Sequence, residues 1–216
     1  STKFGYGVEG VADWTYACIV QGVERALREL RTDHIDIGHL HSCPLPVLQQ
    51  GEVSEALADC VRAGKLRVAA YSGETAELAQ ALADPRFGSV QCSLSLVDPA
   101  NGQPLTATRK GVLVKRALAG RAWAQAQRPE DFCEGRYWDR WQALALPEPA
   151  LPWSELALRW SAFQEGVSSV LLGTRSLTRL HEAQAALARG PLPEALAGAI
   201  ATAQRLAGAR DWPGLV

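Results

Sequence analysis

The chain has 216 residues, long enough for one sizeable domain, and its 47% hydrophobic and 21% charged residues are typical of a folded globular protein. A formal net charge of −1 at pH 7 gives no electrostatic footprint for nucleic-acid binding, and no stretch reaches the roughly 20 apolar residues of a membrane helix. The five cysteines are scattered without metal-ligand spacing, so we expect reduced thiols and a cytoplasmic protein. The abundance of Ala, Leu and Arg indicates a bacterial gene of high GC content.

Six short apolar runs along the chain predict β-strands. In several of them the apolar residues are consecutive and not alternate, which is typical of parallel strands that are covered on both faces. The runs are Ser1–Phe4, Ile35–His41, Leu66–Ser72, Ser89–Leu96, Val112–Arg116 and Val167–Leu172.

Amphipathic helices are predicted between these runs. Residues 19–30 and 53–61 carry apolar side chains at helical spacing, and Gly64 is expected to end the second of these helices. The other expected helices are 76–83 with Thr75 as its cap, 155–163 after Ser154, 177–189 with Ser176 as its cap, and a last one from Pro193 to about Leu206.

A strand followed by a helix, repeated six times, predicts an α/β fold with a parallel sheet wrapped by helices. A barrel and an open doubly wound sheet both fit this order, but no glycine-rich dinucleotide-binding turn follows any strand, which favours the TIM (β/α)8-type barrel. Since such a barrel typically has about 250 residues, we treat residues 1–216 as one partial barrel domain that lacks its first two strand–helix units. The open edges of such a sheet predict that a second copy or a separate N-terminal segment covers them.

Residues 121–152 interrupt the alternation and are rich in Trp, Arg and Pro. We predict an extended loop after the fifth strand, with local helix inside it. Loops at the carboxyl ends of barrel strands carry substrate specificity, so this insertion is a candidate for that role. An aromatic patch that only packs the loop against the barrel explains the composition equally well.

His41 is the first candidate for chemistry, because it ends a predicted strand where the mouth of a barrel would lie. His39 shares its strand face, and for this residue a structural role inside the fold is the preferred interpretation. The two also match the paired histidines of metal-dependent hydrolase barrels. That alternative is weak, because zinc needs at least three protein ligands and the other two histidines, His34 and His181, are poorly placed.

Four further positions could bind or polarise a ligand. Lys3 ends the first run, and a lysine in a barrel interior needs a partner or solvent. Ser72 and Gln91 are polar residues in apolar strands and can hold an amide by hydrogen bonds. Residues 173–176, which comprise Gly173, Thr174, Arg175 and Ser176, join the last strand to a helix, and with Arg179 they predict a phosphate site at the helix N-terminus.

These motifs resemble the aldo-keto reductase family along nearly the whole chain. Residues 1–5 resemble the strand that carries the catalytic lysine of the family, and residues 23–41 resemble its most specific signature, which places the catalytic histidine on His41. The resemblance implies a barrel that binds NADPH across its mouth and reduces a small-molecule aldehyde or ketone. It assigns catalysis to Lys3 and His41, and expects the aspartate and tyrosine of the family upstream of residue 1.

The resemblance also implies the cofactor contacts. Ser72 and Gln91 would hold the nicotinamide carboxamide, Lys115 and Arg116 lie in the segment of nicotinamide stacking and pyrophosphate binding, and residues 173–179 would bind the adenosine 2′-phosphate. The sequence departs from the family at Gly73, where an asparagine is usual, at Lys115, where many members stack an aromatic ring, and at Ala183, where an asparagine often contacts adenine. These departures leave a catalytically decayed barrel that binds a cofactor or a partner as the alternative.

Overall fold

The computed structural model describes residues 1–215, which form two compact units by their internal contacts. The first unit comprises Ser1–Cys92 and Thr108–Val112, and the second comprises Ser93–Ala107 and the chain from Leu113 onward. The strand–helix alternation predicted from the sequence is confirmed in both units. That the chain forms one barrel domain stays a prediction.

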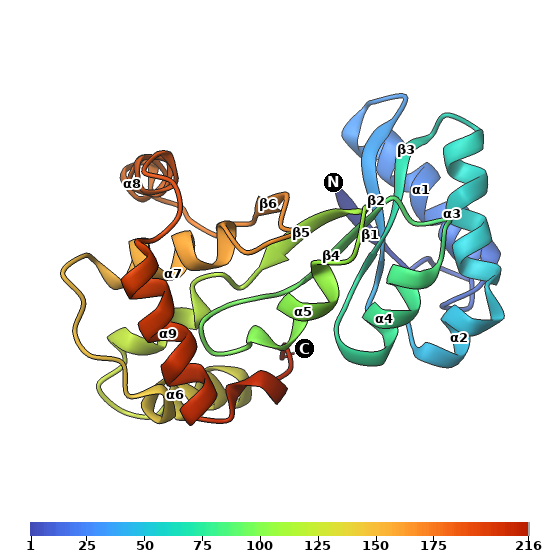
Figure 1. The fold of residues 1–216 in the computed structure, drawn as a ribbon. Helices are drawn as coiled ribbons and strands as arrows, with labels where there is room; N and C mark the ends of the chain where they lie inside the picture. The colour runs from blue at the N-terminus through green and yellow to red at the C-terminus, as the bar shows by residue number, and fades with distance from the viewer. Residues whose placement is uncertain (216) are drawn as a thin grey trace. The chain divides into compact units, whose positions relative to one another are not determined.

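Parallel strands make up the centre of the first unit (Figure 1). They are β1 (Thr2–Phe4), β2 (Ile35–His41), β3 (Leu66–Ser72) and β4 (Ser89–Ser93), and each pairs in parallel with the next. The bounds of β2 and β3 are those that the sequence predicts. The fourth strand ends at Ser93, three residues before its predicted end.

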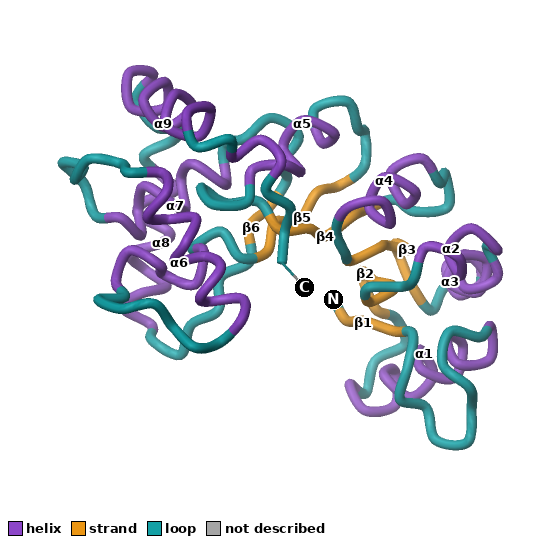
Figure 2. Tube along the Cα trace, turned by 90° about the horizontal axis from the view of Figure 1, so that it is seen from below, coloured by secondary structure: helices purple, strands orange, loops and turns teal. Residues whose placement is uncertain are grey.

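Four helices cover one side of these strands, as Figure 2 shows. They are α1 (Tyr16–Leu30), α2 (Leu45–Gln50), α3 (Glu52–Arg62) and α4 (Thr75–Ala83). The apolar stripes of α1 and α3 are buried, with Ile19, Val23, Val53 and Leu57 fully shielded from solvent. The core of this unit therefore lies between the helices and the strands, as expected for a strand–helix fold.

Two predicted helix ends are wrong. Thr75 was expected as a cap, but it is the first residue of α4, and Glu74 takes the N-cap position. Ser154 was expected before its helix, but α7 (Trp153–Ala162) already begins one residue earlier, after the N-cap Pro152. The pyrrolidine ring of proline fixes φ near the value that Pro152 adopts before α7, although proline has no side-chain acceptor for the first N–H groups of the helix.

Other helix ends are as the sequence predicts. Ser176 caps α8 (Leu177–Ala188) by accepting a hydrogen bond from the backbone N–H of Arg179, at 3.4 Å. Gly64 follows the C-cap of α3 with a φ of +74°, a backbone conformation that favours glycine. The helix that Pro193 precedes is α9 (Glu194–Leu206).

Strand β5 (Gly111–Lys115) begins in the first unit and ends in the second, where Leu113 and Val114 are in parallel register with the two residues of β6 (Ser169–Val170). The predicted last strand, 167–172, is reduced to two residues. The remaining elements are α5 (Gly102–Leu105), α6 (Phe132–Leu144) and three short 3-10 helices, η1 (Pro99–Asn101), η2 (Ala119–Ala124) and η3 (Ala209–Asp211). No helix within residues 1–215 is both long and apolar enough to cross a membrane.

The predicted insertion at 121–152 contains the 13-residue helix α6. Two indole rings of this stretch form a cluster with Trp153 of α7, since Trp141 lies edge-on to Trp123 and to Trp153, with ring centroids 5.9 and 4.6 Å apart. The cluster fits the packing interpretation of this stretch. Its role in substrate specificity stays a prediction.

Candidate functional site

Three polar side chains lie in one row across the strands of the first unit. His41 is in register with Ser72, and Ser72 is in register with Gln91, on β2, β3 and β4 respectively. Residues in register on parallel strands share a face of the sheet, so the three side chains are neighbours. Ser72 and Gln91 are buried, whereas His41 is half-buried at the last position of its strand. The row is therefore a polar site at the carboxyl ends of β2 and β3, with Gln91 contributed from the middle of β4.

Lys3 and His39 lie in the neighbouring row. Lys3 is in register with His39 and is exposed, and β1 extends one residue past it to Phe4. Burial lowers the pKa of His39 to about 4, and the positive charge of Lys3 adds to the effect. His39 is therefore neutral at pH 7, which agrees with the structural role preferred for it above.

A loop between β1 and α1 brings aromatic side chains to His41. The Tyr6 hydroxyl is hydrogen-bonded to Nδ1 of His41, and the two rings are stacked with centroids 5.6 Å apart and planes 27° apart. Trp14 packs edge-on against Tyr6, with ring centroids at 5.8 Å. Sequence reasoning assigned neither Tyr6 nor Trp14 to the site. The only local signal was the position of Tyr6 between two glycines directly after a strand.

Side-chain packing explains why position 73 is a glycine and not the asparagine that is usual in the family. A Cβ atom at this position would lie 2.3 Å from the hydroxyl oxygen of Tyr71, which is inside van der Waals contact. Tyr71 is fully buried, and its hydroxyl donates to the backbone carbonyl of Cys43 at 3.4 Å. An asparagine at position 73 would therefore force the ring of Tyr71 to move. Gly73 cannot make the carboxamide contact that the family resemblance implies for that asparagine.

In the second unit, Lys115 ends β5 and Arg116 follows it with a φ of +61°. The guanidinium of Arg116 donates to the Tyr137 hydroxyl at 3.4 Å and lies 5.9 Å from the centre of the Tyr137 ring. Tyr137 in turn donates to the buried carboxylate of Asp98 at 3.0 Å. Burial, helped by the Asp98 charge, raises the pKa of Tyr137, so this phenol stays protonated. Arg116 is thus part of an internal polar network, and its contact with a cofactor stays a prediction.

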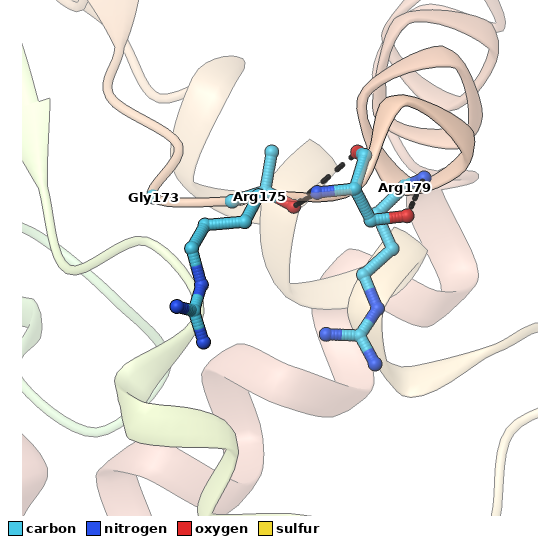
Figure 3. A pocket seen from close by; sticks show the side chains of 5 residues that line it. Gly173, Arg175 and Arg179 are labelled. Carbon is cyan, nitrogen blue, oxygen red and sulfur yellow. Dashed lines mark hydrogen bonds between the residues drawn. The ribbon is translucent and has the colours of Figure 1, made fainter.

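The predicted phosphate site is an open hollow of about 540 Å³ at the N-terminus of α8. Its lining residues are Gly173, Thr174, Arg175, Ser176 and Arg179, none of them acidic. The hydroxyl of Thr174 accepts from the Ser176 backbone N–H at 3.1 Å, which fixes the turn before the helix. Figure 3 shows the Arg175 and Arg179 side chains extending in the same direction. Two guanidinium groups beside a helix N-terminus suit an anion such as a phosphate.

The five sequence-predicted residues at the α8 N-terminus are therefore brought together, as are His41, Ser72 and Gln91 in the first unit. For the metal-dependent alternative, His39 and His41 would need further ligands. Within residues 1–215 no group of three or more His, Cys, Asp or Glu side chains is arranged to hold a metal ion. That alternative thus gains no support from the described side chains.

Comparison with known proteins gives one family and one fold. Residues 1–204 match the sequence model of the aldo/keto reductase family, while no curated protein matches the chain. The holo structure of the aldo-keto reductase AKR11C1 from Bacillus halodurans is 23% identical with a TM-score of 0.76, over 89% of this chain and 68% of that chain.

A second solved structure, the glycerol dehydrogenase AKR11B4 from Gluconobacter oxydans, is 20% identical with a TM-score of 0.71, over 94% of this chain and 71% of that chain. Likeness at these identities establishes the fold, a barrel of the aldo-keto reductase kind, and so confirms the fold class predicted from the sequence.

Proposed function

Since the chain belongs to the aldo/keto reductase family of oxidoreductases, we propose that it reduces an aldehyde or ketone to an alcohol with NADPH as the electron donor. The observation that carries the proposal is the row of His41, Ser72 and Gln91 on adjacent parallel strands, in which His41 and Ser72 are the last residues of β2 and β3. Active sites of α/β barrels lie at the carboxyl ends of the strands. When bound, NADPH supplies the hydride for this reaction.

In this proposal His41 donates a hydrogen bond to the oxygen of the substrate carbonyl. Donation to that oxygen stabilises the negative charge that develops there as the carbonyl is reduced. Lys3 provides the positive charge that, as the family resemblance implies, lowers the pKa of the family's catalytic tyrosine, whose phenol gives its proton to the carbonyl oxygen. The position of Lys3 next to β2, one row before His41, supports this assignment.

The nicotinamide carboxamide would be held by Ser72 and Gln91. A carboxamide has both donor and acceptor atoms, and a hydroxyl with a side-chain amide can satisfy both. Burial of the two side chains keeps competing water away. Lys115 and Arg116 are assigned to the middle of the cofactor, because Lys115 ends β5, Arg116 follows it, and both carry a positive charge that suits a pyrophosphate.

The hollow at the α8 N-terminus would take the adenosine 2′-phosphate. Its two arginines and its helix N-terminus fit a dianion, and this fit is the basis for preferring NADPH over NADH. We also assign the protein to the cytoplasm, where the cofactor is available and where cysteines stay reduced. We further propose that the edge strand β1 is covered by a second copy of the chain or by an N-terminal segment.

The proposed reaction is tested by following the absorbance of NADPH with the purified protein and a set of small aldehydes and ketones. Aldehyde-dependent loss of NADPH absorbance, saturable in both reactants, is the expected result. Saturable NADPH binding without turnover would instead support the decayed barrel, which the glycine at position 73 favours. The absence of both NADPH binding and turnover would contradict the proposal.

A further inference from the structure

The loop that follows β1 has a defined conformation. The backbone N–H of Trp14 donates to the carbonyl of Gly5 at 2.8 Å, and the N–H of Gly7 donates to the Asp13 carboxylate at 3.1 Å. Arg25 of α1 donates to the Gly7 carbonyl at 2.8 Å, which ties the loop to the first helix. Three separate contacts thus hold the segment that carries Tyr6.

Trp14 also explains why a glycine precedes Tyr6. The indole ring lies against Gly5, where an added Cβ atom would come within 2.2 Å of the ring. Gly5 has a φ of +142°, which residues with a side chain rarely adopt. The glycine lets the indole approach the backbone, and the indole edge then supports the ring of Tyr6.

The position of Tyr6 relative to His41 is specific in two ways. Its hydroxyl is hydrogen-bonded to Nδ1, and its ring is stacked on the imidazole. Although the residue is 47% exposed, these contacts join side chains 35 positions apart in the chain. Stacking restricts rotation of the imidazole, while the hydrogen bond distinguishes its two nitrogens.

A neutral imidazole carries one proton, so one nitrogen donates and the other accepts. The hydrogen bond made by one nitrogen sets which of them carries the proton. We propose that Tyr6 is a positioning residue that donates its hydroxyl proton to Nδ1 of His41 and thereby holds the proton of the ring on Nε2. The role rests on the proposed function, because Nε2–H is then the donor that His41 directs to the substrate carbonyl.

Tyr6 acts here through His41 and not on the reacting atoms. A phenol hydroxyl is a good donor to a neutral imidazole nitrogen, which favours this direction of the hydrogen bond over the reverse. The reverse direction would put the proton on Nδ1 and leave Nε2 unable to donate. The two directions therefore predict opposite tautomers, and the tautomer can be measured without any enzymatic assay.

The experiment is long-range ¹H–¹⁵N NMR on protein with ¹⁵N-labelled histidine, with His41 assigned from the signals lost in His41→Gln. In the unmodified protein we expect the ¹⁵N shift of a non-protonated nitrogen for Nδ1 and of a protonated nitrogen for Nε2. In Tyr6→Phe, which keeps the ring but removes the hydroxyl, we expect the two shifts to move toward each other as the tautomers mix. An Nδ1–H tautomer in the unmodified protein, or unchanged shifts in Tyr6→Phe, would overturn the proposal.

Tyr16→Phe is the matched control, because it removes another exposed phenol hydroxyl of the same unit, one that donates to Asp59 at 2.7 Å. The control should leave the His41 shifts unchanged. In both variants the shifts of His34 and His39 report whether the unit is still folded. A Tyr6→Phe protein in which these two also move is replaced by Tyr6→Leu, and unchanged His41 shifts in a folded variant count against the proposal.

A kinetic measurement separates this inference from the proposed function. Tyr6→Phe should lower kcat for carbonyl reduction by about tenfold, as a misoriented donor does, with the Kd for NADPH unchanged. A fall in NADPH affinity with kcat unchanged would contradict a positioning role for Tyr6. If the protein reduces no carbonyl at all, the proposed function fails while the tautomer measurement still decides what Tyr6 does.

Discussion

The two units present polar groups in different ways. In the first unit, Ser72 and Gln91 are buried on strands whose register fixes their spacing, beside the half-buried His41. In the second unit, Arg175 and Arg179 are exposed on a turn and the first helical turn that follows it. A buried strand site holds its groups in fixed positions and suits chemistry, whereas an exposed loop with mobile cations suits recognition of a charged group. The proposed function assigns the two tasks accordingly.

The largest effect is expected from His41→Ala. Removing the donor to the carbonyl oxygen should lower kcat by about 100-fold or more, since loss of such a donor typically has this cost. The Kd for NADPH should stay within about twofold, because in the proposal the cofactor is bound elsewhere. Steady-state kinetics with a saturating aldehyde measure the first quantity, and tryptophan fluorescence measures the second.

His34→Ala is the control for that variant, because His34 lies before β2 and its ring contacts the exposed Asp33. It should retain the kcat of the unmodified protein. If His41→Ala keeps the full kcat, His41 does not take part in the reaction. The assignment of chemistry to the first unit and of charge recognition to the second would then be wrong.

Lowering the pH should destabilise the protein through His39. Its folded pKa of about 4 lies below that of the unfolded chain, near 6.5, so the unfolded state binds more protons between these values. The stability that depends on a neutral His39 is complete above pH 6.5 and is lost as the pH falls toward 4, by on the order of 3 kcal/mol. Urea unfolding at several pH values measures this loss.

His39→Asn should flatten that pH dependence, whereas His181→Asn, at an exposed site on α8 of the second unit, should keep it. An unaltered pH dependence in His39→Asn would show that other groups account for the loss. The comparison of His39→Asn with His181→Asn would then show no difference between a buried histidine in the first unit and an exposed one in the second.

The double variant Arg175→Ala, Arg179→Ala tests the recognition task of the second unit. Each charge-assisted hydrogen bond to a phosphate contributes about 1.5–3 kcal/mol, so NADPH affinity should fall by at least about tenfold. Affinity for NADH, which has no 2′-phosphate, should hardly change. Fluorescence titration with both nucleotides measures the ratio.

Arg205→Ala is the control for the arginine pair, because this exposed residue of α9 donates to the hydroxyl of Thr202, three residues before it on the same helix. It should leave both affinities unchanged. Equal losses of NADPH and NADH affinity in the double variant would mean that the hollow at α8 does not recognise the 2′-phosphate.

The smallest effect is a comparison of two glycines, one in each unit. Gly73→Ala should destabilise the protein by about 1–3 kcal/mol, because the new Cβ would collide with buried Tyr71. Gly198→Ala on exposed α9, where a Cβ meets nothing within 4 Å, should stabilise it by about 0.5–1 kcal/mol. Thermal unfolding of the two variants gives the sign of each change, and a stabilised Gly73→Ala would contradict the packing explanation for this glycine.

The sequence was sufficient where a local pattern determines structure. Short runs rich in apolar residues delimited β2 and β3 correctly, and the hydroxyl of Ser176 correctly marked the start of α8. One predicted cap, Thr75, and one predicted helix start, after Ser154, were wrong, because Glu74 and Pro152 take the N-cap positions of α4 and α7. The bounds of α6 were missed since its apolar residues follow no clear helical stripe in a stretch rich in Trp and Arg.

Part of the candidate site was also predictable from local sequence patterns. His41, Ser72 and Gln91 each end or interrupt an apolar strand, so their types and positions were visible in the sequence, and strand register then placed them together. The contact of Tyr6 with His41 and the exclusion of a side chain at position 73 by Tyr71 were not visible. Both depend on how side chains meet in space, which no periodicity in the sequence encodes.

The most direct test of the central claim is a fluorescence titration of this 216-residue chain with NADPH and with NADH, using its seven tryptophans as the signal. The account predicts saturable binding of NADPH and binding of NADH that is at least about tenfold weaker, since the 2′-phosphate adds charge-assisted contacts. Equal affinity for both nucleotides, or no saturable binding of either, would contradict it.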